Sequence, residues 1–426
     1  MTRNRLFNGF LAKLGPGLLY AGAAVGVSHL VQSTQAGSMF GFDLVIAIVI
    51  IHLIKYPFFE FGPRYTAATG KNILHGYYKL GAWAVWIYLL MILSTMFIIQ
   101  AAVTVVTAGL FTHIFGFEEL GGHEPQVVDM MISGLILLIG LTLLASGRYT
   151  VLDKLMKIII LILSVTTVAA VAVLMFDNPG HYASGTLHFD ITDAVHLLFL
   201  ATFLGWMPAP VELSIWHSIW SESKNETEGR TAGLKDALFD FRVGFIGTAF
   251  LAICFLAIGA LVMYGSGVEF KPGGAAFAEQ LLDMYRQALG DWAYPIVAIA
   301  ALTTMLSTTL VLLDAFPRTI GMSLELLAPQ QFQHRKNKSI YIFWLLITIA
   351  GTLLLLFFLT PSMREMVKVA TVIAFVAAPV LAALNTLAMF DKSVPELYRP
   401  GKIMLIWCIL GLVALAGCSI GYLILM

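Results

Sequence analysis

Long apolar runs separated by short polar segments dominate this chain. A helix needs roughly 17 to 25 apolar residues to cross a bilayer. The pattern predicts eleven spans, at about 15–40, 43–63, 82–112, 127–146, 151–176, 192–220, 238–264, 290–315, 340–359, 364–390 and 401–425. Because these runs cover most of the sequence, we expect an all-α polytopic membrane protein built as one domain over residues 1–426.

The first and the sixth predicted spans contain residues that interrupt helices. Gly22 and Gly26 lie in the middle of the first span, and Pro208 and Pro210 lie in the sixth. Proline removes a backbone hydrogen bond, which a bilayer tolerates only where protein or water satisfies the freed carbonyl groups. Transporters commonly bind substrate at such paired breaks near the bilayer midplane. A kink that only serves helix packing is the alternative interpretation.

The positions of the two breaks predict an internal repeat. Five spans precede the sixth, and an odd number of spans inverts a second copy relative to the first. We therefore expect a five-plus-five inverted repeat, with repeat one at about 15–176, repeat two at about 192–390 and an extra helix at about 401–425.

The composition excludes several classes of protein. Hydrophobic residues make up 59% of the chain and charged residues only 12%, and the mean hydropathy is +0.86. We expect no enzyme, and no cofactor motif is present. The 25 Lys and Arg residues balance the 25 Asp and Glu residues, so no basic surface for nucleic acid is expected. The lipid bilayer is the expected partner, and no obligate protein partner is evident.

The distribution of basic residues predicts the orientation. Most Lys and Arg residues fall on one set of alternate loops, whereas the opposite loops hold only Lys271 and Arg286. Basic residues are retained on the cytoplasmic side of short loops. The N-terminus should therefore be cytoplasmic and the C-terminus outside, and the short loops indicate a plasma-membrane protein of the bacterial inner-membrane type.

Glu212 is the only acidic residue deep within a predicted span. A carboxylate at the membrane centre costs roughly 2.5 to 3.5 kcal/mol on insertion scales. Glu212 should therefore face a polar cavity, pair with a cation or carry a proton, and it is a candidate substrate ligand and proton carrier. A neutral, hydrogen-bonded glutamic acid that fills the gap left by the prolines is the alternative.

Other polar residues in the spans give weaker signals. His29 follows the first break and, with Glu212, could hold a metal ion or a protonated amine, although a lone histidine is often a packing residue. His217 is a second candidate for proton coupling, with a structural role as the alternative. Lys55, near the expected cytoplasmic end of the second span, is interpreted together with His52 as structural or interfacial.

Several short motifs resemble the natural resistance-associated macrophage protein (Nramp) family of proton-coupled divalent-metal transporters. They are Gly15-Pro16, Gln35-Ala36-Gly37, Phe40-Gly41-Phe42, Thr69-Gly70-Lys71, His217-Ser218 and the segment from Phe375 to Pro379. The resemblance covers essentially the whole chain. It implies the LeuT-type inverted-repeat fold of the amino acid/polyamine/organocation superfamily, with broken helices 1 and 6.

The metal-binding motifs of that family do not match. In the same register, the family's Asp-Pro-Gly-Asn falls on residues 26–29, which read Gly-Val-Ser-His. Its Met-Pro-His falls on residues 210–212, so the thioether ligand is missing and Glu212 replaces the histidine. Aligning Met207-Pro208 instead places Ala209 at the histidine position. The family's usual set of carboxylate, amide and thioether ligands is therefore absent.

These observations give one set of candidate site residues and three hypotheses. The substrate or ion-binding candidates are Gly26, Ser28, His29, Ala209, Pro210, Glu212 and Thr371, with Glu212 and His217 for proton coupling and His29 and Glu212 as metal ligands. The leading hypothesis is a secondary transporter that moves a cation by alternating access, with a divalent metal ion implied by the resemblance and proton coupling as a separate expectation. The alternatives are an organic or non-metal substrate, or a non-transporting membrane sensor that kept the fold and lost the metal site.

Overall fold

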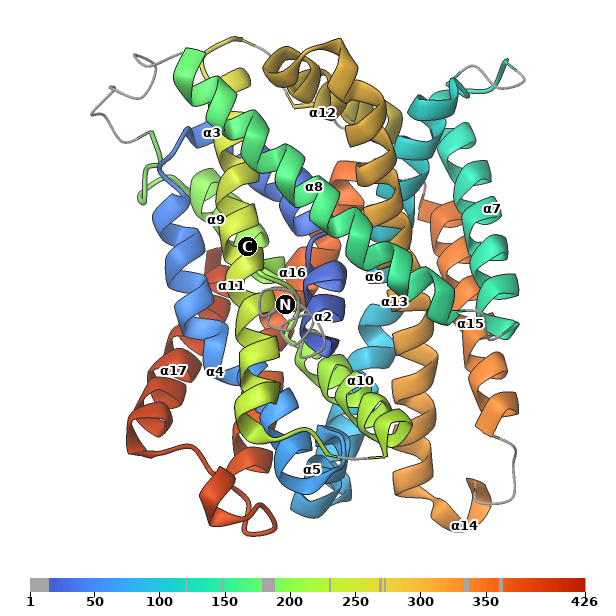
Figure 1. Ribbon diagram of the computed structural model, residues 1–426, viewed down its shortest axis with the longest axis vertical. Helices are drawn as coiled ribbons and strands as arrows, with labels where there is room; N and C mark the ends of the chain where they lie inside the picture. Colours follow the sequence, from blue (N-terminus) through green and yellow to red (C-terminus); the bar gives the residue numbers. More distant parts are fainter. Residues whose placement is uncertain are drawn as a thin grey trace, which may run out of the picture.

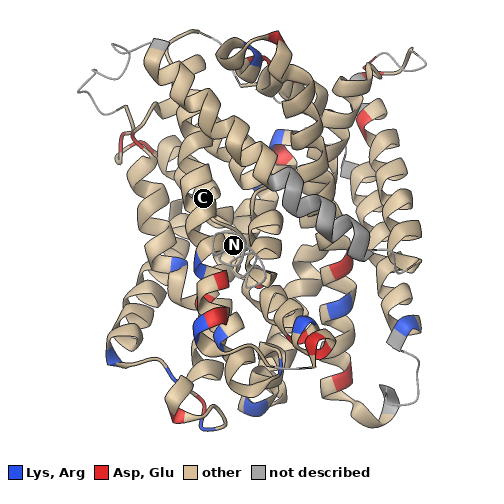
Figure 2. Cartoon of the chain, in the orientation of Figure 1, with Lys and Arg blue, Asp and Glu red and all other residues tan. Residues whose placement is uncertain are grey.

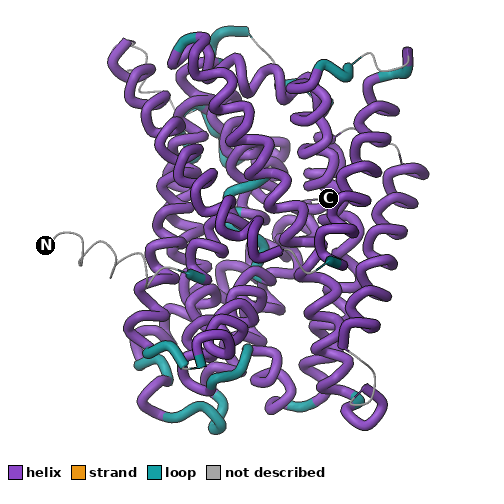
Figure 3. The backbone as a smooth tube through the Cα atoms, turned by 45° about the vertical axis from the view of Figure 1, so that its right-hand side comes forward, coloured by secondary structure: helices purple, strands orange, loops and turns teal. Residues whose placement is uncertain are grey.

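The computed structural model describes residues 15–118, 122–146, 149–177, 188–229, 231–267, 270–271, 273–332, 337–359 and 363–425. Regular secondary structure within these ranges is entirely helical (Figure 3), as the sequence predicts. Some basic residues used to predict the orientation lie outside the described residues: Arg3, Arg5, Lys13, Arg148, Arg230, Arg335 and Lys336.

Eight helices in the described part of the chain are long and apolar enough to cross a membrane. They are α4 (Val45–Thr69), α6 (Ala82–Phe115), α7 (Pro125–Ala145), α11 (Leu234–Val262), α13 (Tyr294–Leu327), α15 (Asn337–Leu359), α16 (Met363–Phe390) and α17 (Lys402–Leu425). A further helix, α8 (Tyr149–Asp177), carries an apolar stretch over Leu161–Phe176. A multi-pass membrane protein is therefore confirmed.

The first and sixth apolar segments are both interrupted, as the glycine and proline positions predict. The first consists of α2 (Pro16–Ala24), a π-helical turn η1 (Ser28–Ser33) and α3 (Thr34–Phe40). The sixth consists of α9 (Ala194–Trp206) and α10 (Glu212–Glu228). The residues between the pieces leave backbone groups outside any regular helical ladder in the middle of the molecule.

Shorter helices cover the two ends of the bundle. Figure 1 shows α12 at one end and α5 and α14 at the other. The bounds are α5 (Ile73–Leu80), α12 (Gly274–Leu289), η3 (Asp291–Ala293), α14 (Pro329–Phe332) and η4 (Glu396–Tyr398).

Close backbone contacts hold the first interrupted segment against α11. The Asp240 carboxylate of α11 accepts hydrogen bonds from the backbone N–H groups of Gly15 (2.9 Å) and Gly17 (2.7 Å), at the start of α2. A Cβ atom on Gly17 would lie 2.1 Å from the Asp240 carbonyl oxygen, and one on Gly259 would lie 2.1 Å from that of Thr34. Only glycine permits these contacts, so both halves of the first span rest directly on the α11 backbone.

The sixth segment is held in the same way by two other helices. α9 packs against α16 and α10 packs against α4. A Cβ atom on Gly205 would lie 2.2 Å from the carbonyl oxygen of Thr371, and one on Gly62 would lie 2.0 Å from that of Ser214. Each half of the sixth span therefore contacts a different uninterrupted helix.

Candidate functional site

A small cavity lies between the two interrupted segments. Its volume is about 40 Å³, and its lining includes Gly26 and Ser28 from the first break and Ala209 and Pro210 from the second. A cavity needs about 10–15 Å³ of water-accessible volume to hold one water molecule. The structure thus brings four of the predicted site residues together around a space with room for a few water molecules or a small ion.

The rest of the lining is mainly apolar, with two hydroxyl groups and two indoles as its polar members. The Thr308 hydroxyl lies 3.5 Å from the Gly22 carbonyl oxygen, and the Ser28 hydroxyl lies 3.5 Å from that of Pro208. The indole N–H groups of the lining residues Trp206 and Trp216 have no hydrogen-bond partner among the described residues.

His29 lies behind this lining and is fully buried. Its Nδ1 atom is 2.8 Å from the Ser28 hydroxyl oxygen, and its Nε2 atom is 3.0 Å from the Thr248 carbonyl oxygen of α11. Because both ring nitrogens have protein partners, metal ligation by His29 requires the ring to give up one of these bonds.

Glu212 is the first residue of α10 and also lies outside the cavity lining. Its side chain is 3% exposed, and neither carboxyl oxygen has a hydrogen-bond partner within the described part of the chain. The carboxyl group faces its own backbone N–H and interacts electrostatically with Lys55. A buried carboxyl group without a hydrogen-bonding partner is costly, as the predicted functional role of Glu212 requires.

Lys55 has partners in the middle of the molecule that sequence reasoning missed. It is completely buried on α4, and its ammonium group donates hydrogen bonds to the carbonyl oxygens of Leu204 (2.8 Å), Gly205 (3.0 Å) and Met207 (3.0 Å). Lys55 is therefore not interfacial. It satisfies carbonyl groups at the end of α9, where a helix leaves its last carbonyls without partners.

His217 and Thr371 do not reach the cavity. The His217 ring stacks on Tyr20 with centroids 5.7 Å apart, and neither of its nitrogens has a partner among the described residues. The Thr371 hydroxyl donates to the Val367 carbonyl oxygen one turn earlier in α16 (2.8 Å). His217 is itself part of α10, and Thr371 of α16 packs against Gly205 of α9; their roles at the site stay predictions.

Asn385 of α16 is a second residue that the sequence did not single out. Its amide group donates to the Ser214 hydroxyl (2.7 Å) and to the Phe58 carbonyl oxygen (3.0 Å), and accepts a hydrogen bond from the Tyr77 hydroxyl (2.6 Å). One buried amide therefore connects α16 with α4, α5 and α10.

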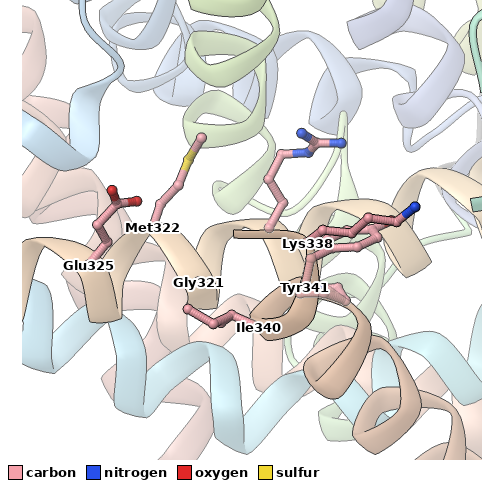
Figure 4. A pocket seen from close by; sticks show the side chains of 8 residues that line it. Gly321, Met322, Glu325, Lys338, Ile340 and Tyr341 are labelled. Atoms are coloured by element: carbon pink, nitrogen blue, oxygen red, sulfur yellow. The ribbon is translucent and has the colours of Figure 1, made fainter. Parts of the chain in front are cut away.

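No group of three or more His, Cys, Asp or Glu side chains that could hold a metal ion occurs in the described ranges. A larger pocket of about 300 Å³ lies between α13 and α15 (Figure 4), lined by residues such as Glu325, Lys338 and Tyr341. It contains none of the predicted site residues, so the candidate site remains the cavity between the breaks.

Sequence comparisons place the chain among known proteins. The profile of the family described as "Natural resistance-associated macrophage protein-like" (Nramp) matches residues 17–425. An uncharacterized protein of Pasteurella multocida (strain Pm70) is 35% identical over 380 residues, which are 88% of this chain and 84% of that protein.

Solved structures share the fold at low sequence identity. A mutant of a manganese transporter from Eremococcus coleocola superposes with a TM-score of 0.69 at 13% identity, covering 95% of this chain and 84% of that one. MhsT in complex with L-phenylalanine superposes with a TM-score of 0.62 at 18% identity, covering 96% and 97%. These neighbours are LeuT-fold transporters, which confirms the predicted fold type.

Proposed function

Because the chain belongs to the natural resistance-associated macrophage protein-like family, a family of membrane transporters and not of enzymes, we propose that it moves a small cation across the membrane by alternating access. The interrupted spans form the substrate path in this proposal. A divalent metal ion is the first candidate substrate, and proton coupling accompanies its movement.

The observation that carries the proposal is the cavity between the breaks. Its water-accessible volume of about 40 Å³ suits a small ion with a few water molecules, and a larger substrate would have to widen it. Ser28 and Thr308 supply hydroxyl oxygens there, and each hydroxyl lies 3.5 Å from a backbone carbonyl oxygen near a break, that of Pro208 or Gly22. Oxygen donors favour hard cations such as Mg²⁺ or Mn²⁺, with retained water molecules completing the coordination.

A second candidate function is transport of an organic or non-metal substrate. Trp206 and Trp216 both line the cavity, and their indole N–H groups have no partner among the described residues. Indole rings bind organic cations, and free N–H groups bind hydrogen-bond acceptors. This alternative requires the cavity to widen when the substrate enters.

Glu212 is the proposed proton carrier, with His217 as a second candidate beside it. Both side chains are buried next to the second break, and neither has a hydrogen-bond partner within the described residues. A group that binds and releases a proton during transport has to exchange partners, and these two groups are not committed to any other hydrogen bond.

For the membrane arrangement, we propose eleven spans in one domain: inverted repeats at about 15–176 and 192–390, followed by an extra helix at about 401–425. The N-terminus lies in the cytoplasm and the C-terminus outside, in a bacterial-type plasma membrane. Figure 2 supports this orientation, because Lys and Arg gather toward the end of the molecule where α5 and α14 lie.

Uptake into proteoliposomes tests the proposed function. Wild-type protein should give saturable flux of at least one of Mn²⁺, Mg²⁺, Zn²⁺ and Ca²⁺, with acidification of the lumen that follows metal entry. Glu212→Gln should abolish the flux, whereas Glu226→Gln, an exposed position on the same helix, should not. Absence of both flux and calorimetric binding for all four ions would refute metal transport and favour the organic substrate or a non-transporting sensor.

A further inference from the structure

The buried ammonium group of Lys55 has no further hydrogen-bonding capacity. A lysine ammonium carries three donors, and all three carbonyl contacts at 2.8, 3.0 and 3.0 Å lie at the end of α9. These carbonyls come from Leu204, Gly205 and Met207, which span the point where the helix gives way to extended backbone. The side chain therefore binds the backbone carbonyl groups of the break itself.

The electrostatics of this position favour a cation. Aligned peptide dipoles give a helix C-terminus a partial negative charge, and the last carbonyls point outward without partners. In transporters with broken helices, such half-helix C-termini coordinate the cations that move with the substrate. In this protein a side chain fixed to α4 satisfies the same group of carbonyl oxygens.

We propose that Lys55 is a tethered cation that takes the place of a bound inorganic ion at the break of α9. Its ammonium group supplies the positive charge and the donors that the free carbonyls need, so no dissolved cation is required there. Lys55 is a positioning residue in this account, because it fixes the end of α9 and does not contact the cavity. A role for Lys55 in transport rests on the proposed function, whereas the claim that Lys55 replaces a bound ion at this break does not.

Glu212 is the counter-charge in this arrangement. It begins the other half of the broken span, so the two charges lie on opposite sides of the break, and they interact electrostatically without a direct ion pair among the described residues. An uncompensated charge in the membrane interior is costly, and charges of opposite sign reduce that cost for each other. Removing one of them should therefore destabilise the break more than removing both.

Thermal unfolding of the purified full-length chain in detergent tests the tethered cation. Lys55→Ala should lower the midpoint in choline chloride by about 4 °C, because it leaves the carbonyls and Glu212 without the ammonium group. Ethylammonium or propylammonium, which can enter the vacated space, should restore most of the loss, and Na⁺ should restore part of it. Wild-type protein and Lys79→Ala, an exposed lysine on α5, should have the same midpoint in all these salts.

A second variant keeps the test decisive if Lys55→Ala does not fold in choline. Lys55→Ala/Glu212→Gln should then be recovered as folded protein, and Lys55→Ala itself should be recovered when extracted in ethylammonium. The proposal is overturned if Lys55→Ala unfolds within about 1 °C of wild type, if no cation restores its midpoint, or if neither variant folds in any cation. Failure of wild-type transport alone would refute the proposed function and leave these midpoints interpretable.

Discussion

The hydrogen bonds of the Asn385 amide allow the stability loss of a substitution to be predicted, because they connect α16 to three other helices. Asn385→Leu keeps the approximate volume of the side chain but removes its hydrogen bonds to Phe58, Tyr77 and Ser214. Each bond contributes about 1 kcal/mol net, and a buried hydroxyl left without a partner costs about 1–3 kcal/mol more. The Tyr77 hydroxyl is fully buried and donates only to Asn385 among the described residues. The expected loss in the free energy of unfolding is about 4–6 kcal/mol.

This loss converts into a measurable shift of the unfolding temperature. With an unfolding entropy of about 2.1 cal/mol/K per residue, the unfolding temperature of a chain of 426 residues falls by about 1 °C for each kcal/mol lost from the free energy of unfolding. Asn385→Leu should therefore unfold about 4–6 °C below wild type when tryptophan fluorescence of the detergent-purified protein is followed on heating.

A neighbouring residue provides the control. Thr386 is half-buried, and its hydroxyl donates only within α16, to the Ala382 carbonyl oxygen (2.8 Å). Thr386→Ala should shift the midpoint by about 1 °C or less. If Asn385→Leu matches Thr386→Ala, the amide does not hold the four helices together and the reasoning is wrong.

Three further predictions concern other parts of the molecule. Gly205→Val should lower the midpoint because its Cβ atom would lie 2.2 Å from a carbonyl oxygen of α16, whereas Gly247→Val, with nothing within 4 Å, should not. After replacement of the native cysteines by serine, Lys271→Cys should react with a membrane-impermeant maleimide on intact cells and Lys392→Cys should not; the reverse would invert the topology. Hydrogen bonds from the hydroxyl and backbone N–H of the serine two positions on hold the pKa of Asp391 below its usual range. This contribution is present above about pH 4 and is lost as the pH falls further, so Asp391→Asn should lower the midpoint at pH 6 and match wild type near pH 3.

The positions of the two breaks could be predicted from the sequence because their causes are local. Proline and glycine act on the backbone of their own residues, so Pro208 and Pro210 locate the gap between α9 and α10 to within a few residues. The same holds for Gly26, which lies between α2 and the π-helical turn. The placement of Ala209 and Ser28 on the cavity follows from these local effects.

The partners of the buried polar groups could not be predicted, because most of them are backbone carbonyls far away in the chain. His29 contacts the Thr248 carbonyl and Lys55 contacts the Leu204 carbonyl. Because every residue carries a backbone carbonyl, the residue types at these positions do not reveal the contacts. One usable signal was overlooked for Lys55. The predicted second span, residues 43–63, already places Lys55 two residues from its centre, and α4 (Val45–Thr69) also has Lys55 near its middle. A lysine at that depth needs a partner inside the protein.

The attachment of Lys55 to α4 also bears on the energy supply for transport. A dissolved ion that binds on one side of a membrane and leaves on the other gives up the free energy of its gradient. An ammonium group attached to the chain cannot leave, so it returns to its starting position in every cycle and contributes no net work. In a protein whose α9 break holds such a group, accumulation of substrate has to be driven by protons, by the membrane potential or by the gradient of the substrate itself.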